Sequence, residues 1–90
     1  LDIALIQTRT PATSPAGLDH VAPLIRRAAA GGAQLVLTPE ATNRLERRPE
    51  GRASLAPEDA DVAAAGLRAL ARELGLWLQV GSVMVRAEDD

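Results

Sequence analysis

The apolar positions along the chain fall into three short runs and two longer periodic segments. The runs cover residues 3–6, 33–38 and 76–85, and the last one is interrupted at Gln79 and at Gly81-Ser82. Short apolar runs without regular polar alternation are typical of strands that are covered on both faces in a parallel or mixed sheet. The pattern therefore predicts three strands.

The first periodic segment lies between the first two predicted strands and spaces its apolar residues three and four apart, as on one face of a helix. It begins at Leu18, after a loop rich in proline, and Gly31-Gly32 ends it. Pro23 leaves the start of this helix open. A start near Asp19 would place the proline in or just past the tolerant first turn, whereas a start near Pro15 would produce a kink.

The second periodic segment is predicted to be a helix with an acidic start at residues 57–61, which complements the positive end of the helix macrodipole. It ends at Gly75, and its predicted buried stripe is Val62, Ala63, Leu67, Leu70, Ala71 and Leu74. Residues 41–56, between the second strand and this helix, show no periodicity, so a structureless connection is expected. Connections of that length are often functional or held by neighbouring chain.

These elements give the order β-α-β-loop-α-β and an α/β fold. The 90 residues form one small domain at most. A right-handed crossover would make the first two strands parallel and place the helix on one face. Two helices on one side leave the other sheet face and at least one edge uncovered, so the sheet is expected to be incomplete.

Composition removes several classes of function. All ten basic residues are Arg, and the absence of Lys and Cys excludes a catalytic amine, a disulfide and a cysteine nucleophile within these residues. The net charge of −2 gives no reason to expect nucleic acid or a membrane as a partner. No apolar run reaches the roughly 20 residues of a membrane span, so a cytoplasmic protein is expected. No metal and no cofactor are expected either. Residue 1 is Leu, which leaves the native start open.

Glu40 is the first candidate for chemistry. It follows the second predicted strand directly, at the end of the stretch Leu37-Thr38-Pro39-Glu40. In open parallel α/β sheets, ligands bind at the carboxyl ends of the strands, where the connecting loops leave a crevice. A sheet end beneath a long connection can also provide the partly desolvated site that favours a carboxylate as a base. The alternative is a solvated loop residue.

Polar residues of the connection have both a structural and a functional interpretation. Asn43 could bind substrate, or it could hold the Glu40 loop as a turn residue. The arginines could bind a substrate carboxylate, but their alternation with Glu46 and Glu50 favours a solvated face. These arginines are Arg44, Arg47, Arg48 and Arg52.

Four stretches of the sequence together carry a resemblance to a known family. They are Ala4-Leu5-Ile6-Gln7, Ala28-Ala29 through Gly32-Ala33, Leu37-Thr38-Pro39-Glu40, and Leu70 through Leu78 running to Gly81-Ser82. In this order and spacing they resemble the N-terminal part of the nitrilase superfamily of carbon–nitrogen hydrolases. The Nit-type amidases, including deaminated glutathione amidase and ω-amidase, are the most similar branch. Residues 1–90 are therefore expected to be an incomplete N-terminal portion of such a domain.

The resemblance implies a four-layer α-β-β-α sandwich and a Glu-Lys-Cys triad. In such enzymes the Glu is the general base for the Cys thiol, the thiolate attacks an amide or nitrile carbon, and the Lys stabilises charge on the oxygen. Glu40 matches the glutamate, whereas the Lys and the Cys lie farther along the family's chain. These residues alone are therefore expected to be inactive. The implied partner is a small-molecule amide, and a homo-oligomer is implied for the full-length protein.

Two functions stay open at this point. One is an amidase-type hydrolase of small amides that contains this chain as its N-terminal portion, with amide, nitrile and carbamoyl substrates not distinguished. The other is a truncated, non-catalytic fragment that associates with other chains through its open sheet. A nucleotide-binding module is disfavoured, because Gly31-Gly32 precedes a strand whereas the dinucleotide fingerprint follows one and opens a helix. His20, near a helix start, is interpreted as structural.

Overall fold

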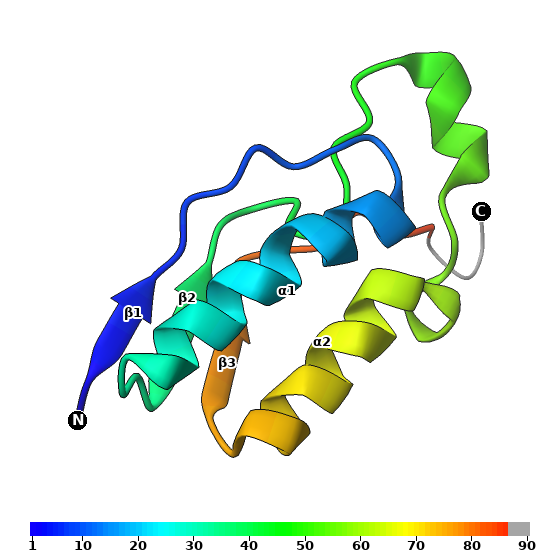
Figure 1. Ribbon diagram of the computed structural model, residues 1–90. Helices are drawn as coiled ribbons and strands as arrows, with labels where there is room; N and C mark the ends of the chain where they lie inside the picture. The colour runs from blue at the N-terminus through cyan, green and yellow to red at the C-terminus, as the bar shows by residue number, and fades with distance from the viewer. Residues whose placement is uncertain (87–90) are drawn as a thin grey trace.

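Three parallel strands form the sheet of the computed structural model, which describes residues 1–86. Strand β2 (Leu35–Thr38) lies between β1 (Ile3–Leu5) and β3 (Trp77–Val80). Helix α1 (Ser14–Ala30) connects β1 to β2, and helix α2 (Val62–Leu74) precedes β3. Figure 1 shows the two helices side by side over the same face of the sheet. The predicted β-α-β-loop-α-β order of an α/β fold is confirmed.

Helix α1 starts earlier than the apolar periodicity predicts. Thr13 is its N-cap, with Oγ1 accepting a hydrogen bond from the backbone NH of Ala16 at 3.4 Å, and Pro15 occupies the first turn. The predicted loop up to Leu18 is therefore wrong, and of the two open starts the one near Pro15 is right. The helix continues through Pro23, which is exposed, so water can reach the carbonyl that the proline leaves without a helical donor.

Helix α2 ends before Gly75 as predicted but begins at Val62, later than the acidic start predicted at residues 57–61, where Glu58–Ala60 form a 3-10 helix instead. Of the predicted stripe, Ala63, Leu67 and Leu70 are buried, and Ala71 and Leu74 are half-buried. The Asp61 carboxylate caps it by accepting from the NH of Ala64 at 2.9 Å, and Gly75 ends it in the left-handed conformation with φ of 63°. Val62 is the exception, because 48% of its surface is exposed. The buried face includes Ala63, and a step of one residue along a helix is a rotation of about 100°, which turns Val62 toward solvent.

The core lies between the helices and one face of the sheet. Its buried members are Val21, Ile25, Val36, Leu67 and Leu70. The opposite sheet face is open although most of its side chains are apolar, with Ile3, Leu5 and Trp77 exposed by 57%, 76% and 77%. The predicted uncovered sheet face is confirmed. No helix in the described part of the chain is long and apolar enough to cross a membrane.

The connection between β2 and α2 is ordered, so the expectation of a structureless segment is wrong. It contains 3-10 helices at Pro49–Ser54 and Glu58–Ala60. Its start packs against the segment that precedes α1, where the NH of Leu45 donates to the carbonyl of Pro11 at 2.7 Å; Figure 1 draws this connection in green. It also buries four polar side chains, those of Thr42, Asn43, Arg44 and Glu46.

Gly17 allows α1 to approach this connection closely, since a Cβ at this position would collide with the backbone carbonyl of Asn43. We expect Gly17→Ala to lower the free energy of unfolding by about 1–3 kcal/mol, despite the better helix propensity of Ala. Urea denaturation measures the change. Gly31→Ala is the control at the end of the same helix, because a Cβ there meets nothing closer than 3.5 Å. Equal losses in the two variants would contradict the close approach.

Candidate functional site

The turn that follows β2 places Glu40 at the carboxyl end of the central strand. Ala41, the next residue, has a φ of 51°, in the left-handed region, which costs an L-residue other than glycine roughly 1–2 kcal/mol. The hydroxyl of Thr42 donates to Oγ1 of Thr38 at 2.9 Å and also lies within hydrogen-bond distance of the carbonyl oxygen of Pro39. The turn is therefore closed by contacts within residues 38–42.

The segment that follows β3 holds the same turn from outside. The NH of Gly81 donates to the carbonyl of Thr38 at 3.0 Å, the NH of Ala41 donates to Oγ of Ser82 at 2.8 Å, and the NH of Thr42 donates to the Ser82 carbonyl at 3.0 Å. A Cβ at Gly81 would lie 2.7 Å from the carbonyl carbon of Pro39, so the close approach requires glycine here.

Asn43 continues this pairing with its side chain. Its Nδ2 donates to the carbonyl of Met84 at 2.8 Å, and its Oδ1 accepts from the NH of Met84 at 2.7 Å. The residue is completely buried. The side-chain amide thus pairs with the backbone of Met84 as a backbone group would in a strand pair. This contact agrees with the interpretation of Asn43 as a residue that holds the loop. Its role in substrate binding stays a prediction.

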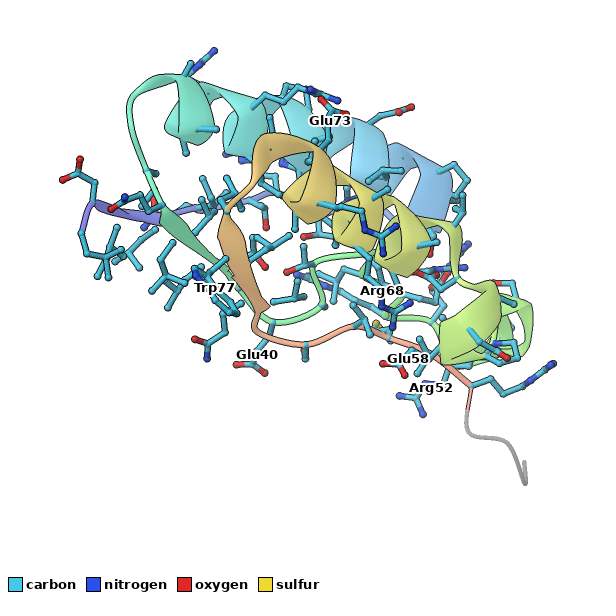
Figure 2. All side chains as sticks on the ribbon, turned by 90° about the horizontal axis from the view of Figure 1, so that it is seen from below. Glu40, Arg52, Glu58, Arg68, Glu73 and Trp77 are labelled. Carbon is cyan, nitrogen blue, oxygen red and sulfur yellow. The ribbon has the colours of Figure 1, made fainter. Side chains whose placement is uncertain are left out.

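The Glu40 carboxylate is exposed and borders an open cavity of about 670 Å³. Figure 2 shows this side chain projecting from the turn to the side of the sheet away from both helices. The cavity carries two cations besides this anion, and its lining consists of Thr8, Arg9, Thr10, Pro39, Glu40, Ala41, Leu45 and Arg47. The connection therefore borders the Glu40 site without covering the carboxylate in the described part of the chain.

The arginines of the connection divide into buried and exposed members. Arg44 is buried and donates from Nη2 to Oγ of Ser54 at 3.0 Å, and the same nitrogen lies 3.7 Å from Oε2 of buried Glu46. The predicted solvated face is therefore wrong for these two residues, because ion pairing and side-chain hydrogen bonds fold them inward. It holds for Arg47 and Arg52, which are exposed.

Two further observations bear on the chemistry of the site. His20 accepts a hydrogen bond at Nε2 from the NH of Arg9 at 3.0 Å, so the imidazole joins α1 to the segment that follows β1. Within residues 1–86, no group of three or more His, Cys, Asp or Glu residues is placed to hold a metal ion. The arrangement offers a single carboxylate at a strand end, flanked by Arg9 and Arg47, and it fits proton transfer to or from a bound group.

Sequence reasoning identified Glu40 but assigned no role in the site to Gly81 and Ser82. These two residues interrupt the third apolar run and end one of the stretches that resemble the family, but neither observation gave them a place in the site. A Gly-Ser step directly after a strand is the signal that could have indicated a close backbone approach.

The protein is an α/β protein whose parallel sheet presents a glutamate at the carboxyl end of its central strand, the end at which such sheets bind ligands. The chain matches the family described as Carbon-nitrogen hydrolase over residues 2–90, and it belongs to this family. The match identifies no particular branch. The three-stranded sheet with its two helices is consistent with the N-terminal part of the nitrilase sandwich. A comparison with curated proteins found no match.

The buried amide of Asn43 predicts a large effect on stability. Asn43→Ala removes both hydrogen bonds to Met84 and leaves that backbone without its partners, so we expect the free energy of unfolding to fall by about 2–3 kcal/mol. Chemical denaturation gives the value. Gln79→Ala serves as a control, because this amide on β3 is exposed and its loss should change stability by less than about 0.5 kcal/mol. An unchanged free energy of unfolding in Asn43→Ala would contradict the loop-holding interpretation and favour the substrate-binding one.

The ion pairs of the connection predict a loss of stability in acid. Hydrogen bonds from the side chain and backbone NH of Arg48 hold the pKa of Glu46 below its ordinary value. A carboxyl whose pKa is lower in the folded state stabilises the fold above its unfolded pKa, and this contribution is lost as the pH falls through the folded pKa. We expect Glu46→Gln to flatten the decline of unfolding free energy between neutral and acid pH. Arg48→Gln should flatten it as well, and an unchanged decline in both variants would exclude the pair as its cause.

Proposed function

We propose that this chain is the N-terminal portion of an amidase-type carbon–nitrogen hydrolase domain in which Glu40 is the general base. The observation that carries the proposal is the position of Glu40, which is exposed at the end of the central strand in a chain of this family. The proposed domain extends beyond Asp90, where the Lys and the Cys of the triad are placed. Residues 1–90 contain neither residue type and are expected to be inactive alone.

The proposed reaction has two stages. Glu40 accepts the proton of the cysteine thiol, the thiolate attacks the amide carbon, and the lysine stabilises the negative charge on the oxygen. The amine or ammonia leaves with a proton and a thioester remains. Glu40 then accepts a proton from water as the water attacks the thioester, which releases the acid and regenerates the thiol.

The proposed substrates are small amides that carry a carboxylate, as the Nit-type amidases use. Arg9 and Arg47 support this choice, because both residues border the same cavity as Glu40. A guanidinium matches a carboxylate through two parallel hydrogen bonds and keeps its charge at every physiological pH. A homo-oligomer is proposed by analogy with the family.

Association without catalysis is the second candidate function, and one observation favours it. The open sheet face carries the exposed side chains of Ile3, Leu5 and Trp77, and contiguous apolar surface of this kind is typical of a face that meets other protein. A truncated chain could bury the apolar side chains of this face only by binding another chain.

The coding sequence after Asp90 separates the two candidates. A continuation that contains a Lys on a strand and later a Cys after another buried strand supports the hydrolase. A stop codon directly after Asp90 rules out catalysis by this product and leaves association.

Glu40→Gln tests the role of the base in the complete gene product. Since positioned acid–base groups contribute typically 10²–10⁴-fold, we expect kcat for ammonia release from a small amide to fall by about that factor. Glu50→Gln is the matched control, because Glu50 is exposed in the 3-10 helix Pro49–Ser54 and should retain turnover. Near-normal turnover of Glu40→Gln would remove Glu40 from the mechanism.

A further inference from the structure

The position of the Glu40 carboxylate depends on the backbone of the residue that follows it. Ala41 has a φ of 51°, a conformation that an alanine rarely adopts without support from its surroundings. Strained backbone of this kind persists only where neighbouring contacts determine it, and it is concentrated at functional sites. The contacts of Ala41 therefore contribute to holding the turn that carries Glu40.

Ser82 supplies the side-chain contact to this backbone. Its Oγ accepts a hydrogen bond from the NH of Ala41 at 2.8 Å. The neighbouring contact, from the NH of Thr42 to the Ser82 carbonyl, uses only backbone atoms and survives a change of side chain. Ser82 is itself exposed, so its hydroxyl adds little packing. Its removal isolates the single hydrogen bond to Ala41.

We propose that Ser82 is a positioning residue that holds Ala41 in the left-handed conformation and thereby fixes the carboxylate of Glu40. The proposal rests on the proposed function of Glu40 as general base. Gly81 makes it geometrically possible, because only glycine allows the segment after β3 to approach Pro39 closely enough for the serine to reach the turn.

The proposal concerns the chemical step more than the binding of substrate. A general base must lie within hydrogen-bond reach of the proton that it accepts, and a displacement of about 1 Å can cost up to about 100-fold in rate. Ser82 is not among the residues that border the cavity beside Glu40. Loss of its hydroxyl should therefore lower kcat and leave KM unchanged.

The test compares Ser82→Ala with two variants in the complete gene product. We expect Ser82→Ala to lower kcat for ammonia release by about 10- to 100-fold at constant KM. Ser82→Thr keeps the hydroxyl and should retain most of the activity. Ala41→Gly combined with Ser82→Ala should recover part of the lost kcat, because glycine adopts positive φ without the penalty of a Cβ. A kcat of Ser82→Ala equal to that of the wild type would overturn the proposal.

Two controls separate positioning from stability and from failure of the base itself. Ile25→Val weakens the core far from the turn, and its kcat should stay that of the wild type at a temperature where both proteins are folded. The crystal structure of the Ser82→Ala protein reports φ of Ala41 directly. If Glu40→Gln retains turnover, the proposed function fails by itself. In that case φ of Ala41 in the Ser82→Ala structure decides whether Ser82 positions the turn. A φ of Ala41 that stays in the left-handed region refutes the positioning role.

Discussion

The backbone pairing between the segment after β3 and the turn after β2 is the constraint on which the site depends. The strands are parallel, so their carboxyl ends meet at one edge of the sheet, and Gly81 lets the two following segments come into contact there. Once they touch, the hydroxyl of Ser82 accepts from the NH of Ala41, the carbonyl of Ser82 accepts from the NH of Thr42, and Met84 pairs with the amide of Asn43. The three contacts follow one another along both segments.

The same pairing explains why the connection between β2 and α2 is ordered. Asn43 directs the chain inward, and Arg44 and Glu46 follow into the interior, where they form an ion pair and Arg44 donates to Ser54. Burial of charge is costly unless each group is paired. The alternation of arginine and glutamate that resembles a solvated surface in the sequence is, in the fold, the condition for burying the segment.

The regular elements could be predicted from the sequence because local patterns determine them. Apolar runs and helical periodicity located three strands and two helices, and a proline directly before Glu40 marked the end of the central strand. The start of α1 was obscured because the cap at Thr13 and the proline after it resemble a loop. The contacts of Asn43 and Arg44 join partners up to 41 residues apart, and no local pattern reports a pair of that kind.

The open sheet face and the exposed Glu40 lie on the same side of the sheet. The carboxylate projects to the side of the sheet away from both helices (Figure 2). Trp77 is exposed on that side, and the strand register places the exposed Ile3 and Leu5 on the same face. A general base gains from a site that excludes water, and apolar side chains gain from the same exclusion. In the sandwich of this family a second sheet is implied on that side. Covering the face would therefore stabilise the fold and enclose Glu40 at once, so a covered core and the proposed general base would form together.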